Sequence, residues 1–201
     1  MLTIKNMSVV SGKRTGKLHP QKFMLWLTIA SIIMMFAGLT SAYIVRKAQG
    51  NWTEFYLPQM FFVSTGIIVG SSVTLYWAYR GFKDYDIDTY RKGIGWTFLL
   101  GVAFAVCQYL GWQQMSASGI LLTGNPSGAF IYLLTGIHAV HVLVGVLLLA
   151  IFYIKSRRIS DIRDVIANSG PYRSLGIELL STYWHFVGIL WIYLLLFFLY
   201  I

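Results

Sequence analysis

The sequence predicts an all-α integral membrane protein, a bundle of five transmembrane helices, and two observations support this. The chain of 201 residues is 57% hydrophobic and only 11% charged, whereas soluble domains average about 45–50% apolar and about 25% charged residues. Five stretches are also long and apolar enough to cross a bilayer, which takes about 20 helical residues. No loop is long enough to fold alone. We therefore expect a basic cytoplasmic segment, residues 1–22, followed by a single transmembrane domain, residues 23–201.

The five spans are expected at about residues 23–45, 59–79, 93–113, 128–154 and 175–200. Each should be a helix, because backbone groups in lipid must pair within their own segment. The first span is too long for the apolar region of a signal peptide, and no convincing cleavage site follows it, so we expect it to be retained. The single cysteine, Cys107, excludes an intrachain disulfide.

The basic residues divide unevenly between the two sides of this alternating topology. One side holds only Arg46 and Lys47, and the other holds the remaining fourteen of 16: Lys5, Lys13, Arg14, Lys17, Lys22, Arg80, Lys83, Arg91, Lys92, Lys155, Arg157, Arg158, Arg163 and Arg173. Cytoplasmic loops carry the excess of Lys and Arg. We therefore expect an inner-membrane protein with its N-terminus cytoplasmic and its C-terminus outside. Orientation explains the net charge of +9, so no nucleic-acid partner is expected.

Polar residues follow one face of the fifth span. Glu178, Ser181, Thr182 and His185 are spaced i, i+3, i+4 and i+7, and the face continues at Gly188. Polar groups at membrane depth are costly and usually face protein or water, so this face should point into the bundle. Glu178 has a second interpretation, as an acidic residue favoured in the first helical turn by the helix dipole.

The fourth span contains "TGIHAVHVLVG", residues 135–145, in which Thr135, His138, His141 and Gly145 share a face. Helical rise places these two imidazoles and that of His185 near the middle of the membrane. The histidines are either interhelical hydrogen-bonding residues, or ligands of a metal or haem, or members of a proton relay. A metal site usually needs a fourth ligand, and none is obvious at that depth.

Other features indicate packing. Gly66 and Gly70 form a small-residue face suited to close helix contact. Trp184 and Trp191 lie deep, and their indole N–H groups need acceptors in the protein or among lipid headgroups, so lipid contact stays open for both. No motif pairs a nucleophile with a base, and no catalytic residue is expected.

Two motifs carry a family resemblance. "YWHFVGILWIYLLLFFLY", together with the upstream Glu178, resembles the last helix of subunit III of haem-copper respiratory oxidases. "TGIHAVHVLVG" resembles the preceding helix of that family. "LGVAFAVCQYLGW" and "STGIIVGSSVTLYWA" resemble two earlier helices in outline. The resemblance covers about residues 23–201 in the family's order, and it matches the last five of the usual seven helices.

The resemblance implies an accessory subunit that holds no redox centre. It would pack on catalytic subunit I of a proton-pumping cytochrome c oxidase in aerobic respiration and support its stability and proton uptake. Haems and copper would lie in partner subunits, phospholipids would bind in a cleft, and a larger respiratory supercomplex is left open. The implied structural polar network comprises His138, His141, Glu178, Ser181, Thr182 and His185.

The sequence departs from the family at several positions. Ile32 stands where the family commonly has a glutamate, and Gly188 stands where it has an aspartate. The family's lipid cleft also depends partly on the two missing helices. Two alternatives stay open. One is subunit III of a quinol oxidase, and the other is a membrane cytochrome or metalloenzyme with His138, His141 and His185 as ligands.

Overall fold

The computed structural model describes residues 19–50, 52, 56–158, 162–163 and 172–201, and within them it contains helices and no strands. The five long helices are α1 (Pro20–Ala48), α2 (Gln59–Lys83), α3 (Ile87–Ala117), α4 (Pro126–Arg157) and α6 (Tyr172–Tyr200). All five are long and apolar enough to cross a membrane. The predicted five-span, all-α fold is confirmed, and each expected span lies within one helix. Of the expected basic segment, residues 1–22, residues 1–18 lie outside the described residues.

Local signals in the sequence explain where several helices begin. Asp86 caps α3, because its carboxylate accepts hydrogen bonds from the backbone N–H groups of Asp88 and Thr89 at 3.1 and 3.2 Å. Asn125 caps α4 by accepting from the N–H of Ser127 at 3.0 Å, and Pro126 follows in the first turn, where its missing N–H costs nothing. The α2–α3 connection is short, with Tyr85 in the left-handed region at φ 59°.

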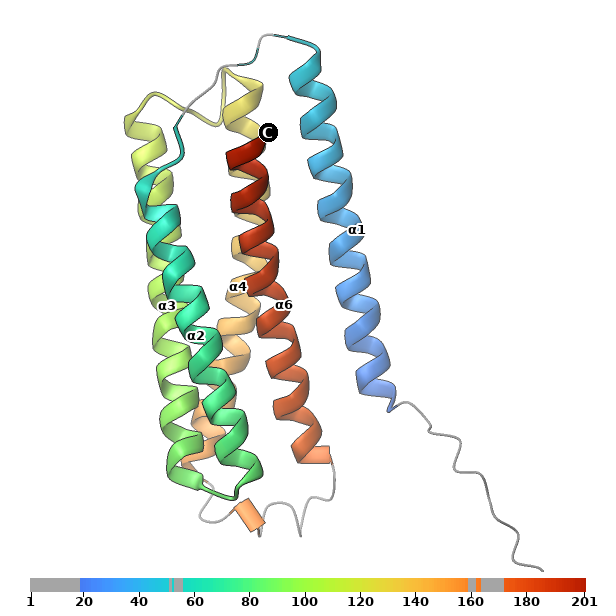
Figure 1. The fold of residues 1–201 in the computed structure, drawn as a ribbon, viewed down its shortest axis with the longest axis vertical. Helices are drawn as coiled ribbons and strands as arrows, with labels where there is room; N and C mark the ends of the chain where they lie inside the picture. Colours follow the sequence, from blue (N-terminus) through green and yellow to red (C-terminus); the bar gives the residue numbers. More distant parts are fainter. Residues whose placement is uncertain (1–18, 51, 53–55, 159–161, 164–171) are drawn as a thin grey trace, which may run out of the picture.

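Figure 1 shows how the helices are arranged. α2 and α3 lie side by side, α4 packs against α3, and α6 packs against both α2 and α4. α1 stands on the outside of this group and contacts only α4 and α6 to an appreciable extent among the described helices. The start of α1, the α2–α3 turn and the end of α4 lie at one end of the bundle, and the C-terminus lies near the other (Figure 1).

The close helix contacts use different glycines from those that the sequence indicated. A Cβ atom built on Gly66 or Gly70 of α2 meets nothing within 4 Å, so this small-residue face makes no tight contact within the described chain. The α2–α3 contact is instead made at Gly93, where a Cβ would lie 2.7 Å from that of Ala78, and at Gly111, where a Cβ would overlap the Phe61 ring. These two glycines let α2 and α3 approach closely.

Candidate functional site

Trp184 of α6 fills the space between α3 and α4. Its ring is 1% exposed. A Cβ atom on Gly101 of α3 would lie 2.8 Å from this ring, and one on Gly145 of α4 would lie 2.9 Å from it. Its indole Nε1 donates a hydrogen bond to Ser71 Oγ of α2 at 3.0 Å. One side chain thus joins four helices, and it fits only because two of its neighbours are glycines.

Trp191 lies two turns further along the same face of α6. It is fully buried, and its Nε1 donates to Thr65 Oγ1 of α2 at 2.9 Å. Phe61 and Phe104 contact its ring edge-on, with centroids 5.4 and 5.5 Å away. The sequence left lipid contact open for both tryptophans. The structure encloses both rings and provides acceptors for both indoles on α2.

The imidazole of His138 on α4 is surrounded by aromatic rings. It is fully buried and stacks on Trp191, with centroids 5.3 Å apart and planes 30° apart. Phe104 of α3 and Phe36 of α1 approach it edge-on at 6.1 and 6.5 Å. Neither ring nitrogen has a hydrogen-bond partner among the described residues. The histidine therefore lies at the point where α1, α3, α4 and α6 converge.

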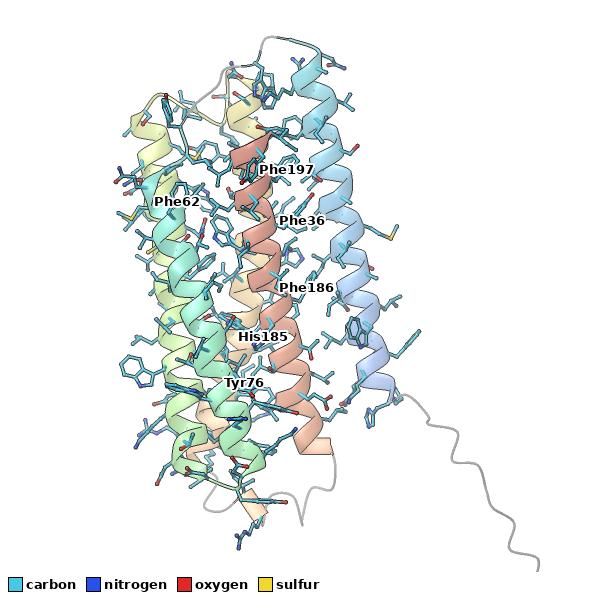
Figure 2. All side chains as sticks on the ribbon, viewed as in Figure 1. Phe36, Phe62, Tyr76, His185, Phe186 and Phe197 are labelled. Carbon is cyan, nitrogen blue, oxygen red and sulfur yellow. The ribbon has the colours of Figure 1, made fainter. Side chains whose placement is uncertain are left out.

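The other two candidate histidines, His141 and His185, bond to their own helices. His141 Nδ1 lies 2.8 Å from the carbonyl oxygen of Ile137, and His185 Nδ1 lies 2.7 Å from that of Ser181. Because a carbonyl oxygen can only accept, Nδ1 carries the proton in both rings. Both residues are half-buried, and Figure 2 shows the position of His185 on α6. The backbone carbonyl of His141 also accepts from Tyr183 Oη of α6 at 2.9 Å.

Glu178 connects α6 with α1. Its Oε1 lies 2.7 Å from Lys22 Nζ, and the two side chains are 44% and 36% exposed respectively. The interpretation of Glu178 as a first-turn residue is wrong, because α6 begins at Tyr172 and its first turn contains no acidic residue. The backbone carbonyl of Glu178 accepts from Thr182 Oγ1 at 2.9 Å.

The six residues of the expected polar network thus lie in two groups. Thr182 and His185 bond to the backbone one turn earlier on α6, to Glu178 and Ser181 respectively, and Ser181 Oγ is 3.5 Å from His185 Nδ1. His138 and His141 lie on α4 and share an edge contact with Phe36 of α1. Figure 2 shows Phe36, Phe186 and Phe197 in the space between α1 and α6. Contacts between aromatic rings therefore outnumber hydrogen bonds in this region.

Sequence reasoning missed the hydroxyl groups of α2 as acceptors. Ser64 Oγ accepts from Gln108 Nε2 of α3 at 3.0 Å, in addition to the indole acceptors Thr65 and Ser71. Thr74 and Thr97 are also in contact, with 2.8 Å between their hydroxyl oxygens. The available signal was the spacing of hydroxyl residues along α2 together with two deep tryptophans that needed acceptors. No comparable pattern in the sequence indicated the ion pair between Lys22 and Glu178.

Several polar side chains of this interior join one helix to another. Within the described ranges, no three His, Cys, Asp or Glu side chains lie together in a group that could hold a metal ion. His138 lies among aromatic rings, while His141 and His185 use one nitrogen each on their own helices. Two indoles, hydroxyls and one amide form several of the hydrogen bonds between helices.

Comparison with known proteins gives one consistent family. The family model described as cytochrome c oxidase subunit III matches residues 4–201. A probable cytochrome c oxidase subunit 3 from Mycobacterium tuberculosis is 32% identical over 174 residues, covering 84% of this chain and 80% of the relative. The corresponding Nocardia farcinica protein is 29% identical with the same coverage. Cytochrome c oxidase subunit 3 of Thermostichus vulcanus is 28% identical, over 88% of this chain and 86% of the relative.

Proposed function

This chain belongs to the cytochrome c oxidase subunit III family, and from that premise we propose that it packs directly on catalytic subunit I of a proton-pumping terminal oxidase. In this role it stabilises the catalytic subunit and supports its uptake of protons during aerobic respiration. It carries no haem or copper of its own, and these centres lie in the partner subunits.

The packed interior supports this accessory role most directly. His138, which would be an obvious ligand in a membrane cytochrome, is enclosed by Trp191, Phe104 and Phe36. The same tryptophan is tied to Thr65 of α2. We propose that the polar residues on the faces of α4 and α6 fix the packing of the bundle. These residues are His138, His141, Glu178, Ser181, Thr182 and His185.

The proposed location is the bacterial inner membrane, with the basic ends of the helices in the cytoplasm. The start of α1, the α2–α3 turn and the end of α4 lie at the same end of the bundle (Figure 1). Arg80, Lys83, Lys155 and Arg157 lie at this end. The positive-inside rule assigns such an end to the cytoplasm.

The electron donor of the complex is proposed to be cytochrome c, as the names of the relatives indicate. A quinol oxidase is the alternative, because the donor site would lie in another subunit. Assays of the purified complex with reduced cytochrome c and with a quinol distinguish these two donors.

Purification in mild detergent through a tag on this chain tests the proposal. We expect a large multi-helix partner identified by mass spectrometry and a visible spectrum of a haem-copper oxidase. Cross-linking in native membranes, before detergent is added, detects a partner that detergent would remove. A chain that cross-links to no oxidase subunit, or that carries its own haem, would overturn the proposal.

A further inference from the structure

Two polar side chains in the middle of the bundle carry buried atoms without a hydrogen-bond partner. Gln108 of α3 and His138 of α4 are both almost completely enclosed. Oε1 of Gln108 and both ring nitrogens of His138 have no partner among the described residues. Buried polar atoms in folded proteins nearly always have a partner, which is either another protein group or ordered water. These three atoms therefore mark a place where a further polar group binds.

Two contacts fix how α3 and α4 lie against each other. A Cβ atom built on Gly101 of α3 would lie 3.2 Å from Cγ2 of Val146 on α4. Further along α3, Trp112 Nε1 donates to Thr135 Oγ1 of α4 at 3.0 Å. Between these contacts α3 advances 11 residues (112 − 101), and α4 covers the same number in the opposite direction (146 − 135). The antiparallel helices therefore keep one register over this stretch.

This register places Gln108 and His138 at the same height. Gln108 is level with the residue that follows His138, so the two differ by about 1.5 Å along the helix axis. The two side chains also face each other. Phe104 lies one turn before Gln108 on the same face of α3, and its ring contacts that of His138 with centroids 6.1 Å apart. The unpartnered atoms of two neighbouring helices thus converge on one place.

The contacts of Gln108 show which kind of partner this place requires. Its Nε2 donates to Ser64 Oγ of α2 at 3.0 Å, and Ser64 Oγ donates to the carbonyl oxygen of Phe61 at 2.8 Å. Oε1 of Gln108 is therefore left as an acceptor that needs a donor. A neutral imidazole offers one N–H donor and one acceptor nitrogen. No direct hydrogen bond joins Oε1 to His138, so a bridging group is required.

We propose that one water molecule binds between α3 and α4 at this height. It donates one hydrogen bond to Gln108 Oε1 and forms a second with a ring nitrogen of His138. Water fits because it both donates and accepts, and buried waters typically join polar groups that otherwise lack partners. The remaining neighbours of the imidazole are the rings of Trp191, Phe104 and Phe36, which lack the several oxygen ligands that a hard cation needs.

The water extends a chain of polar contacts across three helices. Ser64 of α2 and Gln108 of α3 are already joined, and the water connects this pair to His138 of α4. The bridge also explains why an imidazole stands in a pocket of aromatic rings, since a phenylalanine there could not hold the water. The proposal needs only the packing of this chain and does not rest on its place in an oxidase.

Solid-state NMR of the full chain in phosphatidylcholine bilayers tests the site. The chain carries ¹⁵N-labelled histidine, and magnetisation is transferred from water protons to the imidazole nitrogens at short mixing times. The His138→Phe variant identifies the signals of this ring among those of the four histidines. We expect transfer from water to a nitrogen of His138, although this ring is fully buried.

Two variants of α3 separate a bridging water from general access of water to the bundle. Gln108→Met keeps the length of the side chain and removes its oxygen, and we expect the transfer to His138 to be lost, because a buried water needs at least two polar partners. Thr97→Val is the matched control. It also removes a polar contact with α2, that of Thr97 with Thr74 at 2.8 Å, but it lies about 16 Å further along α3, and we expect the transfer to remain.

Should Gln108→Met fail to fold, Gln108→Asn keeps the amide and withdraws its oxygen by one methylene group, and the same loss is expected. Three results would overturn the proposal. Absence of transfer to both nitrogens of His138 in the wild type would show that the ring is dry. Equal transfer in the wild type and in the Gln108 variant would show that Gln108 holds no water. An equal loss in Thr97→Val would show that the transfer depends on the α2–α3 contact as a whole and not on a bridge at Gln108.

Discussion

α1 and α6 are both apolar spans of 29 residues, yet the chain uses them differently. Of the most apolar 18-residue stretch in each helix, 22% is buried in α1 and 50% in α6. On α1, Met24 and Met34 are about two-thirds or more exposed. On α6, Trp184 and Trp191 are almost completely buried. Apolar composition places a helix in lipid, but lipid is as apolar as a leucine side chain, so shape and polar contacts decide which helices pack tightly.

The two helices are also attached by different interactions. α1 is linked to α6 through the Lys22–Glu178 ion pair, a hydrogen bond from Tyr193 Oη to Thr40 Oγ1 at 3.2 Å, and a bond from Lys47 Nζ to the Ile201 carbonyl. α1 also places two buried rings, Phe36 and Tyr43, against α4 and α6, whereas α6 inserts Trp184 into the space that two glycines leave between α3 and α4. Substitution of an inserted ring of α6 should therefore lower the free energy of unfolding several-fold more than substitution in a polar contact of α1.

The largest effect is expected at Trp184. Trp184→Ala removes a ring that fills the space between α3 and α4, and it should lower the free energy of unfolding in detergent by about 3–5 kcal/mol. Trp77→Ala is the matched control, since Trp77 is 60% exposed and should change that free energy by no more than about 0.5 kcal/mol. A similar cost for both substitutions would remove the distinction between packed and lipid-facing aromatics.

A smaller effect is expected from Gly145→Ala. The new methyl group would lie 2.9 Å from two carbons of the rigid Trp184 ring, and such overpacking typically costs about 1–3 kcal/mol. Gly136→Ala on the same helix meets nothing within 4 Å, and the better helix propensity of alanine should make it neutral or stabilising by up to about 1 kcal/mol. Detergent unfolding compares the two, and equal stabilities would contradict the placement of Trp184.

The α1 tether should matter less. Lys22→Gln breaks the ion pair with Glu178, and because both side chains are more than a third exposed, the loss should be about 0.2–1 kcal/mol. Hydrogen exchange at the start of α1 should increase while the core of α6 stays protected. A loss as large as that of Trp184→Ala would mean that α1 is an integral part of the packed core.

The smallest effect is a local one at the start of α3. Hydrogen bonds from the side chain and backbone of Thr89 hold the pKa of Asp86 below its ordinary value of 3.8. Because this pKa is lower in the folded state, the ionised cap stabilises α3 at pH values above the ordinary pKa of 3.8. This stabilisation is lost as the pH falls through the lowered pKa. NMR signals of the Asp88 and Thr89 amides should follow this loss. Asp86→Asn caps without titrating, so a pH response that persists in this variant would exclude Asp86 as its source.

The sequence could predict the five spans because length and composition decide which segments enter a bilayer. It also placed Thr135, His138, His141 and Gly145 on one face of α4, and in the structure all of these except the half-buried His141 are buried. It could not predict that Gly66 and Gly70 point away from the chain while Gly101 and Gly145 accommodate Trp184. Helical spacing shows which residues share a face, but the rotation of each helix against its neighbours depends on all of them together.

The central claim is that the histidines of α4 and α6 serve packing rather than ligation, and His138→Phe tests it most directly. Phenylalanine keeps an aromatic ring among Trp191, Phe104 and Phe36 and removes two nitrogens that have no partner in the described part of the chain. The measurement is the visible haem spectrum of the complex purified through the tagged variant. We predict a spectrum and yield equal to those of the wild type. Loss of a haem or metal from the variant would contradict the claim and identify His138 as a ligand.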